Sequence, residues 1–364
     1  MREFVYEAQP MRVVLRPGAH VTAVPGEVER LGLRRVLVVS GARGTEPARA
    51  VADALGDACA GLHAEARMHV PVEVAERAVE VARQAGADGC VAVGGGSAIG
   101  LGKVIALRTG LPLLAVPSTY SGSEMTPVWG LTEDGVKRTG RDPSVLPRTV
   151  VYDPELTLSL PVGLSVTSGV NAIAHAAEAL YAPDASPLVS LMAEEGVRAM
   201  AGALPALAAA PRDLDARGRA LHGAWLCGAA LGATTMGLHH KLCHVLGGTF
   251  GLPHAETHTA VLPYALAYNA PAAPEAMAAL GRALGTDDVP GAVWDLGKPR
   301  SLAELGLSRA DLKPAAHAVT TQAYPNPREV TEAGVLAVLS AAHAGERPLA
   351  DLSRATTSYE TNQY

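Results

Sequence analysis

Two hydrophobic patterns alternate over the first 150 residues. Continuous apolar runs at 35–40, 90–93 and 113–116 are typical of strands that are buried on both faces of a parallel sheet. Between them, apolar positions recur every three or four residues, which predicts amphipathic helices over 46–60 and 72–85. Strands that alternate with helices pair in parallel through right-handed crossovers. The pattern therefore predicts a doubly wound parallel sheet.

The pattern changes near residue 155. From about residue 163 the strand-like runs disappear, and long alanine- and leucine-rich helical stretches take over. We therefore predict an α/β N-terminal domain over residues 1–158 and an all-α C-terminal domain over residues 159–364, connected through 156–161. Residues 351–364 are polar, and we expect them to be poorly ordered.

Composition narrows the class of protein. The 364 residues are 48% hydrophobic and 18% charged, which fits two globular domains. The formal net charge of −6 argues against a nucleic-acid partner but leaves room for a small anionic substrate. The N-terminus has no apolar signal segment, and no apolar run is long enough for a membrane span. Because the four cysteines form no CxxC pair, we expect reduced thiols and a cytoplasmic location.

A glycine-rich turn joins a predicted strand to a predicted helix. Gly94, Gly95, Gly96 and Ser97 lie where the pyrophosphate of a nucleotide would bind. Without side chains the backbone can approach phosphate closely, and the amides and dipole of the helix N-terminus favour negative charge. The turn is neither a GxGxxG fingerprint nor a P-loop. The alternative interpretation is a tight turn without a ligand.

Hydroxyl side chains follow the next predicted strand. Ser118, Thr119 and Ser123 come after the run at 113–116, at the same edge of the sheet as the glycine-rich turn. Loops after neighbouring parallel strands meet at this edge, so we expect these side chains to line the cofactor crevice. The alternative is an ordinary polar loop that caps the following helix.

Histidines concentrate in the helical half. Seven of the twelve lie between residues 175 and 258. His240 and His244 are spaced i, i+4, as are Asn171 and His175, so each pair shares one helical face. His254 follows a glycine-rich segment that we expect to form a turn. Converging imidazoles favour a metal site or an acid–base site, whereas a single buried histidine is more often part of the core.

Taken in order, these residues resemble the iron-containing alcohol dehydrogenase superfamily. The resemblance covers about residues 10–345 and implies a dehydroquinate synthase-like architecture, a nicotinamide cofactor and a homodimer. The stretches that carry it are Gly94–Ser97 with Lys103, Ser121–Glu124, Asn171 with His175, His240 with His244, and Pro253-His254.

Three departures from the metal-dependent dehydrogenases resemble the maleylacetate reductase branch. Asn171 and Gly100 stand where the metal-dependent members carry aspartates, and the loop at 117–124 is shorter. That branch reduces the carbon–carbon double bond of maleylacetate to 3-oxoadipate with NADH or NADPH in the breakdown of aromatic compounds. The resemblance therefore implies a small dicarboxylate substrate.

The replacement at Asn171 predicts that no metal is required. A carboxamide offers only a neutral oxygen, so it binds a divalent ion less well than a carboxylate. Residual zinc at His175, His240 and His254 is the alternative. Without a metal, an imidazolium or a lysine must stabilise the enolate that hydride addition creates.

Roles follow for the predicted catalytic residues. We hypothesise that His244 or His254 is the proton donor, that His175 and His240 orient the substrate, and that Lys241 meets a substrate carboxylate. Lys137, Arg138 and Arg141 are further cationic candidates, each with a solvated surface charge as the alternative. For Glu124 and Glu178 we predict structural or capping roles.

Other functions stay open at this point. One is a metal-dependent alcohol dehydrogenase, and another is a reductase of a related unsaturated oxo-acid. A third class is a non-catalytic nucleotide-binding or dehydroquinate synthase-like protein with the same fold. The segment 40–43 has one arginine and no acid, which leaves both NADH and NADPH possible.

Overall fold

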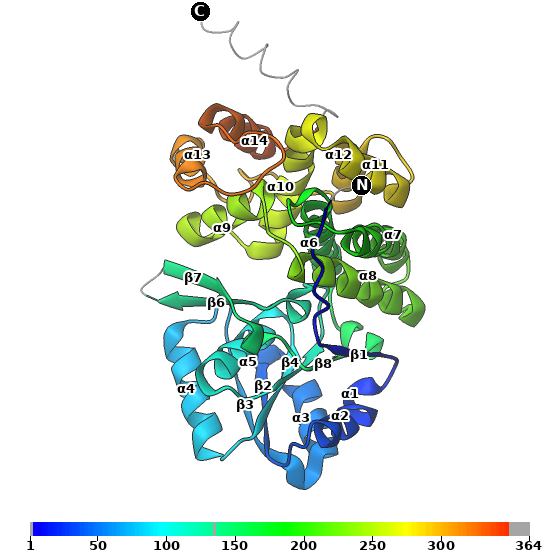
Figure 1. Cartoon of the computed structure of the whole chain (residues 1–364), viewed down its shortest axis with the longest axis vertical. Helices are drawn as coiled ribbons and strands as arrows, with labels where there is room; N and C mark the ends of the chain where they lie inside the picture. The colour runs from blue at the N-terminus through cyan, green and yellow to red at the C-terminus, as the bar shows by residue number, and fades with distance from the viewer. Residues whose placement is uncertain (1–2, 134–135, 349–364) are drawn as a thin grey trace, which may run out of the picture.

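The chain folds into an α/β half and a helical half. The computed structural model describes residues 3–133 and 136–348, so the predicted disorder at 351–364 lies outside the described residues. Figure 1 shows the parallel sheet with its helices in the lower half and a cluster of helices above it. The predicted fold class is confirmed. The division at 158/159 stays a prediction, although helix α6 (Val162–Tyr181) begins close to it.

Six parallel strands form the sheet in the order β1-β8-β5-β4-β2-β3. Their bounds are β1 Arg12–Leu15, β2 Val36–Gly41, β3 Cys59–Ala66, β4 Gly89–Gly94, β5 Leu113–Pro117 and β8 Thr149–Tyr152. β4, β5 and β8 are buried throughout, as is β2 up to its last residue. This burial explains the continuous apolar runs, because such strands meet helices on both faces.

Helices cover the two faces of the sheet. They are α1 Ala19–Thr22, α2 Val24–Arg30, α3 Thr45–Leu55, α4 Val72–Gln84 and α5 Gly96–Thr109. Val36 and Val38 of β2 pack in one hydrophobic cluster with α1–α3, while Leu37 and Val39 pack in another with α4 and α5. Successive side chains of a strand point to opposite faces, so α1–α3 and α4–α5 lie on opposite sides of the sheet.

Several parts of the α/β half were not predicted, among them the strands β1 and β8 and the helices α1 and α2. The predicted helix 46–60 ends at Leu55, because Gly56 takes a positive φ of 54° and the chain then enters β3. β3 is an edge strand that is only partly buried, so it has no continuous apolar run. The antiparallel hairpin of β6 (Val128–Glu133) and β7 (Val136–Arg141) was also missed.

The helical half packs around two hydrophobic clusters. Its helices are α6 Val162–Tyr181, α7 Pro187–Ala209, α8 Leu214–Gly232, α9 Leu238–Phe250, α10 His254–Asn269, α11 Pro274–Leu284, α12 Val289–Gly297, α13 Leu312–Thr320 and α14 Glu332–Ala344. The glycine-rich segment before His254 is mostly helical, which corrects the predicted turn. α9 continues to Phe250, and only Gly251 has the positive φ, 69°, that ends it.

Side chains from the α/β half bind the end of α8. The Arg141 guanidinium donates to the carbonyl oxygens of Gly232, at 3.0 and 3.1 Å, and of Thr234, at 3.1 Å. The Gln9 amide donates to the same Gly232 oxygen at 2.7 Å. In Figure 1 the N-terminal segment accordingly runs from the helical half down to β1. These bonds satisfy carbonyls that a helix C-terminus leaves open, and they fix the two halves relative to each other.

Two further expectations concern thiols and membranes. Cys59, Cys90, Cys227 and Cys243 are all free, and three of them are buried. Within residues 3–133 and 136–348, no helix combines the length and the apolar character that crossing a membrane requires.

Candidate active site

The sheet order creates a crevice at the carboxyl ends of the strands. β2 lies between β3 and β4, so the chain leaves β2 toward one edge of the sheet and returns on the other side of it. Connections that diverge in this way open a crevice where nucleotides bind in doubly wound sheets. The loops after β2 and β4 flank that point.

The glycine-rich turn after β4 packs tightly against the loop after β5. Gly94 has a φ of 139°, a conformation that favours glycine. A Cβ atom on Gly95 would lie 3.0 Å from Cγ2 of Thr119, so any side chain there would push the two loops apart. α5 begins at Gly96 without a side-chain cap, which leaves its first amides directed toward the crevice.

The hydroxyl loop lies beside this turn, as predicted. Thr119 Oγ1 and Ser121 Oγ are buried without a hydrogen-bond partner, which is unusual for hydroxyls unless a ligand or water binds them. Thr119, Ser121 and Ser123 line the cleft. Ser118 does not line it, because it is still aligned with the sheet, and its amide donates to the Gly94 carbonyl at 3.1 Å.

Lys103 holds the end of this loop in place. Its Nζ atom lies 2.6 Å from the Ser123 carbonyl oxygen, 2.8 Å from those of Thr126 and Val128, and 3.0 Å from Thr126 Oγ1. Burial lowers the pKa of Lys103 to about 7, and the Glu124 carboxylate opposes that shift. Since three donors serve four oxygens, Lys103 is engaged in the fold and does not reach out to a substrate.

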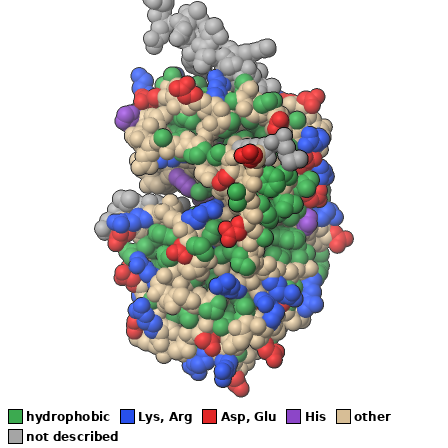
Figure 2. Space-filling model, viewed as in Figure 1, with side chains coloured by type: hydrophobic (Ala, Val, Ile, Leu, Met, Phe, Trp, Pro, Cys, Tyr) green, Lys and Arg blue, Asp and Glu red, His purple; other side chains and the backbone are tan. Residues whose placement is uncertain are grey.

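A cleft of about 510 Å³ lies between the two halves. Its walls include Gly96 and Ser97 from the α/β half. From the helical half, its polar lining includes Asn171, His175, His240, His244, His254 and His258. Figure 2 shows the molecule hollowed between its halves, with histidine at the surface of the hollow. A larger cavity of about 970 Å³ lies among α6, α7 and α12, but it contains neither the glycine turn nor a histidine, so the smaller cleft is the candidate site.

The structure brings the predicted histidines together from three helices. His175 on α6 stacks on His240 of α9, with ring centroids 5.2 Å apart. His244 lies one turn further along α9, 6.2 Å from His240, and His254 begins α10. Burial lowers the pKa of His175 well below its ordinary value, and the neighbouring imidazoles lower it further. In the absence of an anion, His175 is therefore held as a neutral imidazole.

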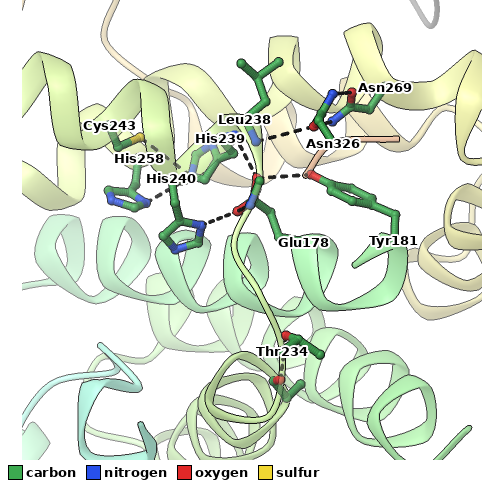
Figure 3. Close-up of polar contacts among 12 residues, drawn as sticks. Glu178, Tyr181, Thr234, Leu238, His239, His240, Cys243, His258, Asn269 and Asn326 are labelled. Carbon is green, nitrogen blue, oxygen red and sulfur yellow. Dashed lines mark hydrogen bonds and ion pairs between the residues drawn. The ribbon is translucent and has the colours of Figure 1, made fainter. Parts of the chain in front are cut away.

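Glu178 holds His240 in one orientation (Figure 3). Glu178 Oε2 accepts from His240 Nδ1 at 2.6 Å, and the Glu178 carboxylate also accepts from the amides of Gly237 and His239. Burial alone would raise the pKa of Glu178, but these contacts lower it below its ordinary value. Nδ1 of His240 therefore carries a proton toward Glu178, and Nε2, which is buried without a partner, is the nitrogen left to meet a substrate.

A second histidine pair lies behind the first. His239 Nε2 and His258 Nδ1 are 3.0 Å apart, and Cys243 Sγ lies 3.8 Å from the same His239 nitrogen. His258 also lines the cleft, and its ring lies 4.3 Å from that of His254. Sequence analysis assigned no role to His239, His258 or the Glu178–His240 contact. The i, i+4 spacing of His254 and His258 was the available signal.

The predicted cations do not lie where a substrate would bind. Lys241 Nζ is 3.5 Å from Gln322 Oε1 at the surface, and Lys241 does not line the cleft, because it lies on another face of α9 than His240. Arg138 pairs with Glu133 at 2.9 Å, and Arg141 binds α8. The side chain of Lys137 lies outside the described residues. Lys241 as a catalytic residue is therefore not supported by this geometry.

The residues present fit a catalytic metal poorly. Asn171 supplies an unpartnered buried carboxamide oxygen, which binds a divalent ion less well than a carboxylate would. Among the described residues, two sets of three side chains bring ligand atoms within 4.8 Å of one another, and His175, His240 and His254 are not such a set. The two sets are His239 with Cys243 and His258, and His20 with Asp153 and Glu155. We therefore derive no catalytic step through a metal.

Comparison with known proteins agrees with this architecture. Residues 10–154 match the family model described as iron-containing alcohol dehydrogenase, and residues 165–343 match the model of the C-terminal part of the Fe-containing alcohol dehydrogenase family. The chain therefore belongs to the iron-containing alcohol dehydrogenase family, and it is an oxidoreductase.

Within the family, the chain is similar to proteins named maleylacetate reductase. It is 53% identical to the one from Burkholderia cepacia over 352 residues, which are 96% of this chain and 100% of the relative. It is 52% identical to the one from Sphingobium indicum, covering 95% of this chain and 99% of the relative. The crystal structure of maleylacetate reductase from Agrobacterium tumefaciens superposes with a TM-score of 0.92 at 51% identity, covering 96% of this chain and 100% of the other.

Proposed function

We propose that this protein uses NADH or NADPH to reduce the carbon–carbon double bond of maleylacetate, which gives 3-oxoadipate. The observation that carries the proposal is the 53% and 52% identity with maleylacetate reductases over nearly the full chain. The site supports it, because a glycine-rich turn suited to a nucleotide and a cluster of histidines line the same cleft.

The reaction needs a group that stabilises negative charge and a group that supplies a proton. A nicotinamide held at the glycine-rich turn would supply a hydride to the double bond, and the electron pair of that bond would move toward the ketone and leave an enolate on the substrate. His244 or His254 donates the proton that completes the reduction. His175 and His240 orient the substrate and stabilise the enolate oxygen. Through its contact with His240 Nδ1, Glu178 directs Nε2 of that ring toward the cleft.

The preference between the two cofactors follows from the loop after β2. Arg43 is exposed in that loop, and the segment 40–43 contains no acid that would repel a 2′-phosphate. Use of both NADH and NADPH is therefore the expectation. We place the protein in the cytoplasm as a homodimer without nucleic-acid or membrane partners, in line with its net charge and its reduced cysteines. Light scattering after gel filtration checks the dimer.

An absorbance assay of nicotinamide oxidation tests the proposal. Purified protein is mixed with maleylacetate and either NADH or NADPH, with and without EDTA. We expect turnover with both cofactors, unchanged by EDTA, and 3-oxoadipate as the product. The matched variant Asn171→Asp restores a carboxylate beside His175, so it should retain more zinc or iron on purification than the wild type does.

Two outcomes would contradict the proposal. Turnover that is lost with EDTA and restored by iron or zinc would favour a metal-dependent alcohol dehydrogenase. Turnover of other unsaturated oxo-acids with a much higher kcat/KM than that of maleylacetate would assign a different substrate.

A further inference from the structure

A strained turn lies at the wall of the cleft. His69 and Val70, between β3 and α4, have φ angles of 63° and 46°. Among the described residues, Lys298 is the one other non-glycine residue with a positive φ. The left-handed region is uncommon for any side chain and a true outlier for a β-branched one. Such strain persists only where the surrounding structure imposes it, and it gathers at functional sites.

Two neighbouring elements impose this conformation. On β6, the Thr132 amide donates to the Val70 carbonyl at 3.1 Å, and Thr132 Oγ1 donates to the His69 carbonyl at 2.9 Å. On α5, Gly100 provides the space that Val70 fills, since a Cβ atom on Gly100 would lie 2.9 Å from Cγ2 of Val70. Val70 is accordingly 5% exposed. The turn is therefore held between a strand and a helix of the α/β half.

The strained conformation is better explained by the side chains that the turn presents than by the need to connect β3 with α4. Glycine adopts a positive φ without strain, and a turn needed only to connect β3 with α4 would be satisfied by glycine at both positions. Here one position is a histidine that lines the cleft beside Gly96 and Ser97. The histidines of α6, α9 and α10 line the same cleft from the helical half. His69 thus borders the space in which a substrate would lie between the halves.

The described lining of the cleft offers an anion few cationic side chains apart from histidine. Among its described lining residues there is no arginine, and Lys103 already serves four oxygens of the fold. The lining does contain a carboxylate, Glu256, which repels anions. A dicarboxylate must then be recognised by imidazoles, hydroxyls and backbone amides. An imidazole N–H donates to a carboxylate whether or not the ring is charged.

We propose that His69 is a substrate-binding residue, placed by the strained turn so that its imidazole binds one carboxylate of the dicarboxylate substrate. The proposal rests on the proposed function, because it takes the substrate class from it. The turn then sets specificity from the α/β half, while the histidines of the helical half act on the reacting double bond and ketone.

The variant His69→Asn tests this directly. Asparagine tolerates the left-handed conformation, so the turn should be kept while the imidazole is lost. We expect the KM for maleylacetate to rise at least about tenfold, as for a lost hydrogen bond to a charged group. The dissociation constant of NADH, followed by its fluorescence, should stay within about twofold, and Tm should not fall.

Two matched controls separate binding from strain. Met68→Ala changes an exposed neighbour that lines the same cleft, and Lys298→Asn makes a comparable substitution at a left-handed residue that does not line it. Both should leave the KM for maleylacetate within about twofold of wild type. If His69→Asn does not fold, His69→Gly accepts the same φ and carries the same expectation.

The possible failures are distinguishable. A wild-type protein that does not oxidise NADH or NADPH with maleylacetate contradicts the proposed function. Wild-type turnover with an unchanged KM in His69→Asn overturns the role of His69. An equal loss of NADH binding and of maleylacetate binding also overturns it, because the turn would then serve the nucleotide.

Discussion

Glu178 decides which nitrogen of His240 faces the cleft. Its carboxylate is fully buried, and it accepts from two backbone amides as well as from His240 Nδ1 at 2.6 Å. A buried carboxylate with several donors is held in one position, so the imidazole plane and its tautomer are fixed with it. The orientation of His240 is therefore set from behind the cleft, by a residue that does not touch the substrate.

The variant Glu178→Gln should separate this positioning from folding. Glutamine has nearly the same shape, but it lacks the charge that stabilises a protonated His240, and its amide can turn a donor toward Nδ1. We expect kcat to fall by about ten- to a hundredfold with little change in KM, since partners of this kind typically have effects of that size. The pH–rate profile should shift as well, which a purely structural loss would not produce.

Tyr181→Phe is the control for that variant. Tyr181 Oη lies 3.5 Å from Glu178 Oε1, so its removal disturbs the same pocket while leaving the contact with His240 intact. Wild-type kcat in Glu178→Gln, or an equal loss in both variants, would contradict the positioning role of Glu178.

Lys103 fixes the position of the loop after β5 in a similar way. Helix α5 contributes both the glycine-rich N-terminus and, two turns later, the lysine whose Nζ binds oxygens of residues 123–128. The phosphate-binding turn and the hydroxyl loop are thus connected through one helix. A shift of the loop after β5 would therefore change the geometry of the cofactor crevice.

We expect Lys103→Met to destabilise the protein. The substitution leaves several buried oxygens without donors, and the free energy of unfolding should fall by about 3 kcal/mol. Urea denaturation measures the loss, and the KM for NADH should rise as the loop relaxes. Lys241→Met is the matched control, because the Lys241 side chain binds Gln322 at the surface and its removal should change stability by less than about 0.5 kcal/mol. Equal stability of the two variants would refute the role of Lys103.

The strands β2, β4 and β5 were predictable from their apolar runs, whereas β1 and β3 at the edges of the sheet and the inner strand β8 were not. β2, β4 and β5 have continuous apolar runs because both of their faces are covered. β3 lies at the sheet edge and is only partly buried, so its sequence has no such run. The helix that ends at Leu55 was overextended, because alanines continue beyond Gly56 and only the backbone conformation of that glycine marks the end.

The site residues were predictable where their spacing along a single helix places them on the same face. Asn171 with His175 and His240 with His244 share helix faces, and these pairs do line the cleft. Contacts across helices, such as that of Glu178 with His240, depend on how α6 and α9 pack, which no local pattern encodes. The strain at His69 is likewise invisible in sequence, because it is imposed by residues from α5 and β6.

Three histidines beside the cleft are buried by the packing of helices that lie far apart in the sequence. His175, His239 and His258 are nearly inaccessible, and burial lowers the pKa of each well below the ordinary value of 6.5, with further lowering by neighbouring imidazoles. The folded protein therefore keeps these rings neutral at a pH where the unfolded chain protonates them. Lowering the pH should therefore destabilise the folded protein, because these three histidines are protonated more readily in the unfolded chain.

The pH dependence of stability follows from that difference. Below pH 6.5 the unfolded chain binds more protons than the folded one, so the free energy of unfolding should fall as pH falls, by up to about 1.4 kcal/mol per pH unit for each such histidine. Above pH 6.5 both states are neutral at these positions, and their contribution should be constant. Urea denaturation between about pH 7 and pH 5 measures the slope, and His258→Asn should make it shallower. An identical slope in the variant and the wild type would mean that His258 takes up its proton in the folded protein as readily as in the unfolded chain.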